Sequence, residues 1–409
     1  MPKQEKSRLL LFPAGPAQRE AFIEAKNKGL FIITMDGDEN APCKDMADQF
    51  FPVNPANTEA ALQLARNLHR EQALDGVLLV GSDLPVTCAL IAQECGLNGP
   101  KLEAAKLTIN KYEMKQRLAQ HNVPVPPFYK ITAPAEICAI MEKSRARQCI
   151  IKPNDNCGAR GISVIQHSRE AEPAFERAWD NRRGEGFLVL EEYMAGPQIS
   201  IEGIVLGETV HITGIADRNY DKLDLYYPYV IENGADIPCS LPHQAIEEIK
   251  QVFTRAVYAL GITDCVVKGD MVWNREQAFV IEVAARISGG KFASRLVPEA
   301  TGINLLSIAM DACMGVPVSE DRFVASKDKF VCVRYFFPQP GIVSNVEGAE
   351  RLDRLAYIID KSLPKSGQKF QRITCHADRG GWIVCSGNSR DESRKRVLEA
   401  MQSIKINYV

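Results

Sequence analysis

Between two apolar runs the chain reads Lys152-Pro153-Asn154-Asp155-Asn156-Cys157-Gly158-Ala159-Arg160-Gly161. The flanking runs, 149–152 and 162–165, predict two strands joined by this loop. Glycines and small polar side chains let backbone N–H groups surround phosphate oxygens, while Lys152 and Arg160 add positive charge. The loop therefore indicates phosphate binding, with a plain hairpin loop as the alternative. It is not a Walker loop, because the G-x-x-x-x-G-K-[ST] spacing is absent.

Further along the chain, two acidic residues interrupt apolar runs that predict strands over 266–273 and 278–283. If these strands form a hairpin that turns at 275–277, the residues facing each other have numbers that sum to 552. This register places Asp270 opposite Glu282. Like charges so placed repel, and hard oxygen ligands with no Cys or His nearby suit Mg²⁺ or Mn²⁺. The alternative is a solvated strand face on which Lys268 neutralises one of the two acids.

An arginine follows this pair at a spacing that suits phosphoryl chemistry. Arg286 stands four residues after Glu282, in a segment that ends in Gly289 and Gly290. A guanidinium there can hold a phosphoryl or acyl-phosphate oxygen with two hydrogen bonds. The alternative is an ion pair back to Glu282.

Two other segments suggest contacts with a nucleoside. The strand expected over 187–191 runs into Glu192-Tyr193-Met194 and stops at Ala195-Gly196-Pro197. Such a strand exit can offer backbone groups to an adenine edge between apolar side chains. Glu202 interrupts another apolar strand and can accept hydrogen bonds from ribose hydroxyls, although a surface glutamate fits the pattern equally well.

The remaining pattern divides the chain into three parts. In the first hundred residues strands (9–12, 30–35, 76–80) alternate with helices (17–28, 58–70, 84–95), which predicts an open parallel sheet covered by helices. Antiparallel strands are expected afterwards, over 149–152, 162–165, 187–191, 199–206, 209–216, 266–273 and 278–283. Their helices are expected over 107–120, 134–143, 171–181, 244–260 and 304–315. The last part mixes short strands with a closing helix over 390–403.

Composition excludes several classes of protein. The 409 residues carry 49 Lys+Arg and 51 Asp+Glu, a formal charge of -2, so no global basic field favours a nucleic-acid partner. No apolar run approaches the roughly 18 residues of a membrane span. Twelve scattered cysteines without a C-x-x-C pair indicate reduced thiols and a cytoplasmic location. The first turn, 13–16, lacks the G-x-G-x-x-G spacing of a dinucleotide site.

Taken in chain order, these residues resemble the ATP-grasp superfamily. The resemblance implies that Lys111 and Lys152 contact the phosphates of ATP and that Asp270 and Glu282 hold Mg²⁺ or Mn²⁺. It makes Arg286 the catalytic arginine of the E-x-N-x-R signature. The resemblance also implies three further groups of ATP-binding residues. A mobile hairpin contains Gly158, Ala159, Arg160 and Gly161, and the adenine-binding segment contains Glu191, Glu192, Tyr193 and Met194. The third is Glu202.

The sequence departs from the superfamily pattern at two positions. Ala284 stands where the signature has asparagine, which removes one usual ligand of metal and phosphate. Asp270 stands where glutamate is more common. Both departures leave a site with two carboxylates.

The resemblance also implies a domain plan like that of carboxylate–amine ligases such as L-amino-acid ligases and glycinamide ribonucleotide synthetase. An open parallel α/β domain is expected over 1–106 and an ATP-grasp domain over 107–318, with a lid at about 127–195. A small C-terminal α+β domain is expected over 319–409.

The implied activity is ADP-forming ligation of a small carboxylate to an amine through an acyl phosphate. Alternatives are a carboxyphosphate-forming carboxylase, a phosphotransferase and a non-catalytic nucleotide-binding protein. The polar, aromatic stretch 217–229 suits an amino-acid-like substrate, and a homodimer is an open alternative to a monomer. The candidate substrate residues are Arg218, Tyr220, Lys268, Ser288, Gly289, Gly290, Lys291 and Arg295.

Overall fold

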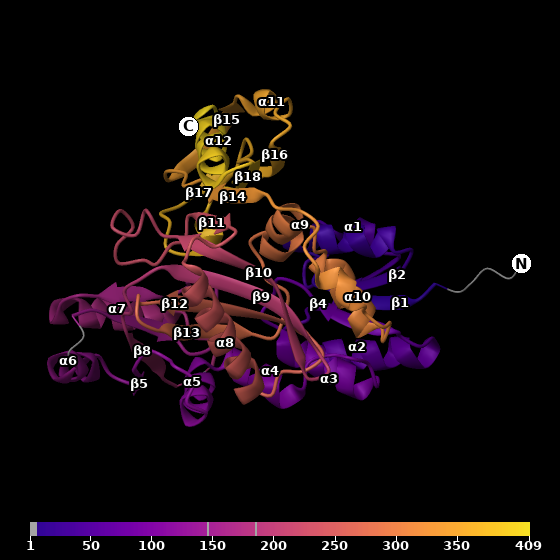
Figure 1. Cartoon of the computed structure of the whole chain (residues 1–409), viewed down its shortest axis with the longest axis horizontal. Helices are drawn as coiled ribbons and strands as arrows, with labels where there is room; N and C mark the ends of the chain where they lie inside the picture. Colours follow the sequence, from indigo (N-terminus) through magenta and orange to yellow (C-terminus); the bar gives the residue numbers. More distant parts are fainter. Residues whose placement is uncertain (1–5, 145–146, 185) are drawn as a thin grey trace, which may run out of the picture.

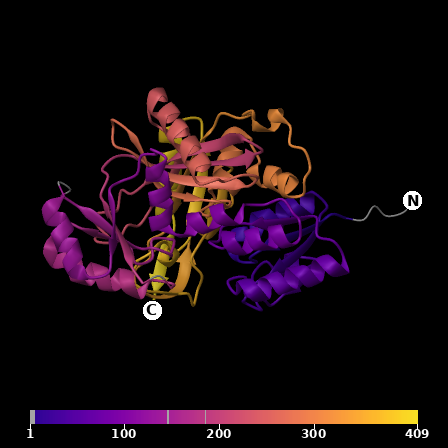
Figure 2. The same ribbon diagram turned by 90° about the horizontal axis from the view of Figure 1, so that it is seen from below.

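The computed structural model describes residues 6–144, 147–184 and 186–409 of the chain. Three lobes surround a central sheet (Figure 1). The sheet of the N-terminal lobe and a four-stranded sheet that carries the loop 154–161 lie at opposite ends of the molecule (Figure 2). The C-terminal lobe lies above both (Figure 1).

The N-terminal lobe contains the expected parallel sheet. Its strands have the order β3-β2-β1-β4, and every pairing among them is parallel. The bounds are β1 Arg8–Phe12, β2 Phe31–Met35, β3 Gln49–Phe51 and β4 Gly76–Leu79. Helices α1 (Arg19–Asn27), α2 (Thr58–Glu71) and α3 (Pro85–Glu94) complete this lobe. β1 and β4 are buried throughout, as strands covered by helices on both faces must be.

The prediction of a single helix over 107–120 is wrong, because the chain forms two helices in this region. These are α4 (Leu102–Ile109) and α5 (Lys111–Gln120). Asn110 separates them with φ −108° and ψ 100°, and its side chain accepts a hydrogen bond from the Glu113 backbone N–H. This N-cap ends one helix and begins the next. Lys111 is therefore in the first turn of α5.

A second sheet forms the lid lobe. Its strands have the order β5-β8-β6-β7 and all pairings are antiparallel. The bounds are β5 Phe128–Ile131, β6 Cys149–Pro153, β7 Ser163–Ile165 and β8 Leu188–Glu192. Helices α6 (Pro134–Lys143) and α7 (Ala171–Asp180) pack against it around one hydrophobic cluster that includes Ile151, Leu188 and Leu190. The loop between β6 and β7 is the glycine-rich stretch.

The central sheet has eight antiparallel strands in the order β13-β12-β9-β10-β11-β14-β18-β16. The first five are β13 Ala278–Ala284, β12 Val266–Trp273, β9 Gln198–Leu206, β10 Thr209–Asn219 and β11 Gly234–Ile237. Helix α8 (His243–Ala259) packs on β12 and β13. The predicted register is confirmed at the decisive pair, since Asp270 faces Glu282. Beyond it the register shifts by one residue, so that Met271 faces Val280 and Ile281 forms a bulge.

The last three strands of this sheet come from the C-terminal part of the chain. They are β14 (Phe330–Tyr335), β18 (Trp382–Gly387) and β16 (Ile358–Ser362). The sheet therefore crosses the expected boundary at 318/319, and the three-domain division stays a prediction. The other elements are α9 Val297–Thr301, α10 Leu305–Cys313, α11 Ala349–Leu352, α12 Arg390–Gln402 and a small sheet of β15 Gly341–Glu347, β17 Lys369–Phe370 and β19 Lys405–Tyr408.

Across the three described ranges, the structure contains no helix with the length and apolar character needed to cross a membrane. All twelve cysteines are free thiols.

Candidate active site

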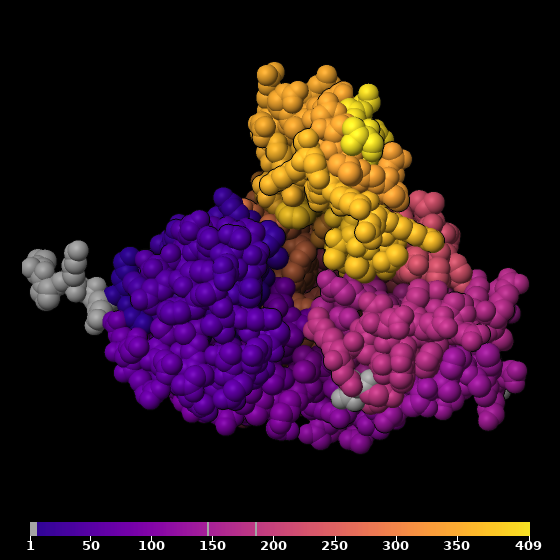
Figure 3. Space-filling view, turned by 180° about the vertical axis from the view of Figure 1, so that it is seen from behind, coloured from indigo at the N-terminus to yellow at the C-terminus, as the bar shows by residue number. Residues whose placement is uncertain are grey.

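A cavity of about 970 Å³ opens where the three lobes meet. Figure 3 shows the N-terminal lobe, the C-terminal lobe and the lid surrounding this hollow. Most of the site residues expected from the sequence line it, including the two lysines, the two carboxylates and Arg286. Gly161, Glu202, Lys291 and Arg295 are not among the lining residues.

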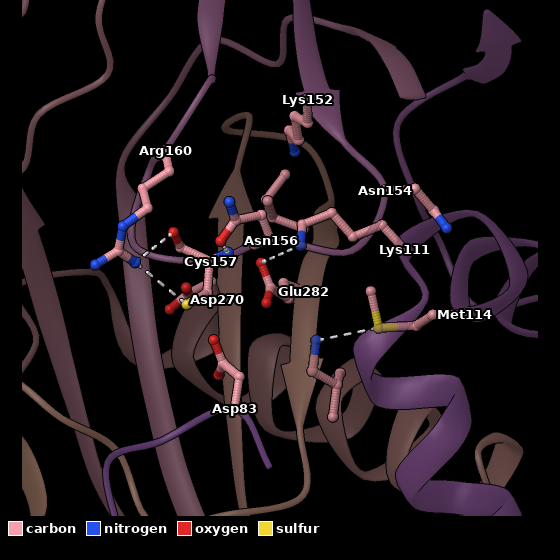
Figure 4. Close-up of polar contacts among 12 residues, drawn as sticks. Asp83, Lys111, Met114, Lys152, Asn154, Asn156, Cys157, Arg160, Asp270 and Glu282 are labelled. Atoms are coloured by element: carbon pink, nitrogen blue, oxygen red, sulfur yellow. Dashed lines mark hydrogen bonds and ion pairs between the residues drawn. The ribbon is translucent and has the colours of Figure 1, made fainter. Parts of the chain in front are cut away.

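Lys111 reaches the cavity from the start of α5. Its Nζ donates to the Asn156 carbonyl at 2.5 Å and lies 4.0 Å from a Glu282 carboxylate oxygen (Figure 4). The Lys111 backbone N–H donates to the Asn154 carbonyl at 3.1 Å. The N-cap of α5 and the glycine-rich loop thus fix one cation beside the carboxylate pair.

Lys152, at the end of β6, belongs to a buried charge cluster. Its Nζ lies 2.8 Å from Glu191 Oε1, and Lys115 Nζ lies 3.2 Å from Glu191 Oε2. Burial alone would raise the pKa of Glu191, but the two ammonium groups outweigh it and hold that pKa below its ordinary value. The Glu191 side chain, expected near adenine, therefore contacts lysines instead. Lys115 was missed, although it stands four residues after Lys111 and hence on the same helix face.

The glycine-rich loop contacts the other two lobes. The Gly158 carbonyl accepts a hydrogen bond from the His376 backbone N–H, in the C-terminal part, at 3.0 Å. Within the loop, Arg160 donates to the Cys157 carbonyl at 3.3 Å (Figure 4). Burial and the carboxylate of Asp83, in the N-terminal lobe, raise the pKa of the Cys157 thiol to about 11, which disfavours the thiolate that a nucleophilic cysteine requires.

The two facing carboxylates have different surroundings. Asp270 lies 2.9 Å from Arg218 NH1 and 2.8 Å from Lys268 Nζ. Burial disfavours its charge, but Arg218 and Lys268 outweigh burial and hold the pKa of Asp270 well below its usual range. Among the described residues, the ionic partner of Glu282 is Lys111, whose Nζ lies 4.0 Å from a carboxylate oxygen.

This donor set fits a hard cation that is shared with a phosphate-bearing ligand. Within the described ranges, no group of three or more His, Cys, Asp or Glu side chains could hold a metal ion by itself. Glu282 keeps oxygen atoms free for such an ion, whereas Asp270 would have to exchange part of its contact with Lys268 and Arg218. Mg²⁺ commonly takes one or two carboxylates and completes its shell with phosphate oxygens and water.

Arg286 does not pair with Glu282. Its Nε and NH2 lie 2.9 and 2.8 Å from Asp83 Oδ1. Asp83 follows the end of β4, so the N-terminal lobe orients this arginine at the edge of the cavity. The sequence offered one signal for Asp83, its position in the loop four residues after the buried parallel strand β4, where ligand sites of such sheets gather.

Glu202 lies outside the cavity wall. It is fully buried, and its carboxylate accepts hydrogen bonds from the Ser288 backbone N–H at 2.6 Å and the Ser288 hydroxyl at 2.8 Å. Burial raises the pKa of Glu202 to about 7, although these hydrogen bonds oppose the shift. The ribose contact expected of Glu202 therefore gains no support, while Ser288, Gly289 and Gly290 do line the cavity.

Lys291 and Arg295, both expected at the substrate, join the lobes to one another instead. Lys291 Nζ lies 3.0 Å from Glu20 of α1 and 3.7 Å from Asp360 of β16. Arg295 NH2 lies 3.5 Å from Glu20.

The wall opposite Lys152 combines charge and aromatic rings. Glu232 Oε2 accepts from Arg218 Nε at 2.9 Å and NH2 at 2.6 Å. Arg379 donates to the Glu232 carbonyl at 3.0 Å and lies 3.5 Å above the Tyr335 ring. Arg379 Nε also donates to the His376 carbonyl at 2.9 Å, and the Arg379 charge helps to hold the pKa of Glu232 below its ordinary value, after the larger effect of Arg218.

The His376 ring belongs to the same wall. Its Nε2 accepts the Glu232 backbone N–H at 3.3 Å, and burial together with the Arg379 charge lowers its pKa to about 3. Glu232, Tyr335, His376 and Arg379 were all missed, because no local pattern marks them.

The strand exit after β8 also lines the cavity. Glu192, Tyr193 and Met194 form part of its wall. The backbone N–H of Glu192 donates to the Pro127 carbonyl at 2.9 Å, and that of Tyr193 donates to the Gln148 carbonyl at 3.0 Å. Both backbone amides therefore already have hydrogen-bond acceptors within the lid. An adenine base at this edge would contact other backbone groups and the Met194 side chain.

Comparison with known proteins agrees with this geometry. Residues 108–290 match the family model of the ATP-grasp domain, and residues 334–409 match L-amino acid ligase C-terminal domain 2. A formate-dependent phosphoribosylglycinamide formyltransferase from Sulfurisphaera tokodaii is 22% identical over 419 residues, spanning 98% of this chain and 97% of that protein.

Solved structures share the fold over the whole chain. The L-amino acid ligase from Bacillus licheniformis superposes with a TM-score of 0.84 at 21% identity, covering all of both chains. Phosphoribosylglycinamide synthetase from Anaerococcus prevotii superposes with a TM-score of 0.76 at 20% identity, covering 99% of this chain and 100% of that one.

Proposed function

We propose that this chain, in which residues 108–290 match the ATP-grasp domain and residues 334–409 match an L-amino acid ligase C-terminal domain, is an ADP-forming ligase. It joins a small carboxylate, an amino acid, to an amine in an ATP- and Mg²⁺-dependent reaction. The observation that carries the proposal is the shared cavity. It combines cations suited to a triphosphate, two facing carboxylates and a wall of mixed charge and aromatic character. That wall is suited to a small zwitterion.

At the phosphate end, Lys111, Lys152 and Arg160 bind the phosphates of ATP. Asp270 and Glu282 would hold Mg²⁺ or Mn²⁺, which would supply positive charge to neutralise the phosphates. The loop 154–161 covers this end and excludes water, because an acyl phosphate would otherwise hydrolyse.

The reaction proceeds in two displacements. A carboxylate oxygen of the substrate attacks the γ-phosphorus of ATP, the bond to the β–γ bridging oxygen breaks, and ADP leaves. The amine nitrogen then attacks the acyl carbon, and phosphate leaves as the amide forms and the nitrogen loses a proton. Arg286, oriented by Asp83, is placed to stabilise oxygen charge in both steps.

At the substrate end, the wall formed by Tyr220, Glu232 and Arg379 recognises the two substrates. The guanidinium of Arg379, which lines the cavity and is held by the His376 and Glu232 carbonyls, suits a carboxylate. Glu232, which uses one carboxylate oxygen for Arg218, keeps the other for an ammonium group.

The test is ADP and phosphate release from the purified chain with MgATP and pools of amino acids. Release that requires an amino acid, with an amide product of matching mass, supports the proposal. ATP turnover that ignores every carboxylate and amine supplied would contradict it.

A second candidate is activation of a one-carbon acid, favoured by relatives of two kinds. The Sulfurisphaera tokodaii relative is named as formate-dependent, and N5-carboxyaminoimidazole ribonucleotide synthetase from Thermotoga maritima shares the fold with a TM-score of 0.74 at 14% identity over 98% of this chain and all of that one. Parallel assays with formate and with bicarbonate in place of amino acids distinguish this candidate. ADP release that depends on either acid alone would replace the amino-acid proposal.

A further inference from the structure

A buried lysine behind the cavity wall has no role in the function proposed above. Lys115 of α5 is completely buried and is not among the residues that line the cavity. Its ammonium group lies 3.2 Å from Glu191 Oε2 and donates to the Ile281 carbonyl at 3.1 Å. Glu191, 2% exposed, in turn holds Lys152 at 2.8 Å.

The net charge of the cluster formed by Lys115, Glu191 and Lys152 depends on Lys115. Lys152 and Glu191 alone would form a neutral pair, and a neutral pair adds little attraction for an anion. With Lys115 the cluster has two cations and one anion, hence a net charge of +1, and Lys152 is the cation that reaches the cavity. In a buried environment one such charge strongly affects a nearby phosphate, because screening there is weak.

Other charged groups near Lys115 do not change this count. Glu282, on the neighbouring strand β13, faces the cavity and pairs with Lys111. Burial lowers the pKa of Lys115 to about 8, whereas the Glu191 carboxylate, 3.2 Å away, opposes this shift and favours the charged ammonium form.

We propose that Lys115 is a positioning residue that neutralises Glu191, so that the charge of Lys152 remains available to the phosphates of a bound nucleotide. This inference rests on the proposed function, since it takes the ligand of Lys152 to be a nucleotide phosphate. The competing explanation is structural, with Lys115 serving only to tie α5 to β13 through Ile281.

The experiment compares the affinities of MgADP and adenosine for wild type and for Lys115→Met, by calorimetry. Lys115→Met keeps the length of the side chain but removes its charge. We expect this variant to weaken the affinity for MgADP by about tenfold. Its affinity for adenosine, which has no phosphate, should change by less than about twofold. An equal loss for both ligands, or no loss for either, would overturn the inference.

A double variant separates charge from structure. Lys115→Met combined with Glu191→Gln removes both the lysine and the charge that it neutralises, so Lys152 again presents an uncompensated charge. We expect MgADP affinity to return to within about threefold of wild type. Failure of this rescue in a folded protein would count against neutralisation.

Two further proteins complete the design. Lys106→Met, at a half-exposed lysine of α4, is the matched control and should bind MgADP as wild type does. If Lys115→Met does not fold, Glu191→Gln alone decides: affinity for MgADP at or above wild type supports the inference, and a loss overturns it. Absence of MgADP binding by wild type would instead refute the proposed function itself, and this inference with it.

Discussion

Asp270 and Glu282 face each other across two strands, yet only Glu282 keeps oxygen atoms free for a new partner. Arg218 and Lys268 hold Asp270 in an ion-pair network that is part of the folded protein. Loss of one partner of a buried ion pair typically costs about 3–5 kcal/mol, so a change at Asp270 would alter stability as well as binding. Glu282 is therefore the cleaner position for a test of the metal site.

For Glu282→Gln we expect a loss of Mg²⁺-dependent ATP turnover of at least about a hundredfold, because the amide removes the charge that would hold the cation. The melting temperature should stay near that of wild type, since the ionic partner recorded for Glu282 is Lys111 at 4.0 Å. Turnover is measured as ADP release over a range of Mg²⁺ concentrations. Full turnover at every concentration would contradict the metal assignment.

The sequence could predict this carboxylate pair because register in a hairpin follows from local strand lengths. It also suggested Lys268 as a neutralising cation, and Lys268 Nζ does lie 2.8 Å from Asp270, but it did not indicate Arg218 as the second partner. Asp83 pairs with Arg286 across 203 positions of sequence, and Lys291 joins Glu20 to Asp360 across three lobes. Such contacts depend on how the lobes pack, which no local pattern encodes.

Glu202 makes the stability of the fold depend on pH. Burial raises its folded pKa to about 7, above the ordinary glutamate value, so the folded state holds this proton more tightly than the unfolded state does. The stabilisation that this proton contributes is fully present below the pKa of Glu202 in the unfolded state. It is lost as the pH rises through the pKa of Glu202 in the folded state.

For Glu202→Gln, which keeps an acceptor for Ser288, we expect little change in the free energy of unfolding at about pH 5 and a gain of about 1–3 kcal/mol at about pH 8. Denaturant unfolding of both proteins at the two pH values measures the difference. A gain that is equal at both pH values would show that the buried charge is not its source.

Among the elements, the loop between β6 and β7 is held by its backbone conformation. Gly158, Ala159 and Gly161 have φ values of 65°, 62° and 71°, in the left-handed region. A Cβ atom at Gly161 would lie 2.7 Å from the Cβ of Asn181 and 2.9 Å from Cγ of Pro153. Ala159 already carries a side chain in this conformation, at a cost of roughly 1–2 kcal/mol.

A matched pair of variants tests the loop. Gly161→Ala should destabilise the lid by about 1–2 kcal/mol and weaken MgADP binding, because both strain and overlap disfavour the observed conformation. Ala159→Gly should leave MgADP affinity near wild type, since glycine adopts the same φ without strain. Thermal unfolding and calorimetry measure both. Wild-type affinity in a stable Gly161→Ala protein would show that the loop conformation does not matter for the nucleotide.

At the same scale, element type was easier to predict than element ends. The alternation of apolar and polar residues identified the parallel strands near the N-terminus and the hairpin of β12 and β13. It missed the break at Asn110, where a single side-chain hydrogen bond to Glu113 decides between one helix and two. It also missed β3, a strand of three residues, and β11, one of four.

On the scale of the whole molecule, one hydrophobic cluster joins all three parts of the chain. It includes Leu9 from β1, Ile204 from β9, Val331 from β14 and Val384 from β18. The eight-stranded sheet likewise continues from the central part into the C-terminal part through the pairing of β11 with β14.

A chain that ends at residue 318 should therefore be poorly soluble. It would expose the edge of β11, uncover part of the shared core and lack His376 and Arg379 at the cavity. Solubility on expression and size-exclusion chromatography provide the measurement. A soluble, monomeric product that still binds MgADP would show that the C-terminal part is an independent cap.

The continuous sheet also determines which side of the cavity can change shape. Because β14 and β18 are hydrogen-bonded into the same sheet as Asp270 and Glu282, the wall that contains Tyr335 has a fixed distance to the carboxylates. The lid has its own sheet and reaches the other lobes through contacts such as the one between Gly158 and His376. If the chain is the ligase proposed above, entry and exit of its ligands should therefore be asymmetric. We expect the nucleotide side to adapt as the lid moves, and the opposite side to act as a rigid template that selects substrates by size and charge.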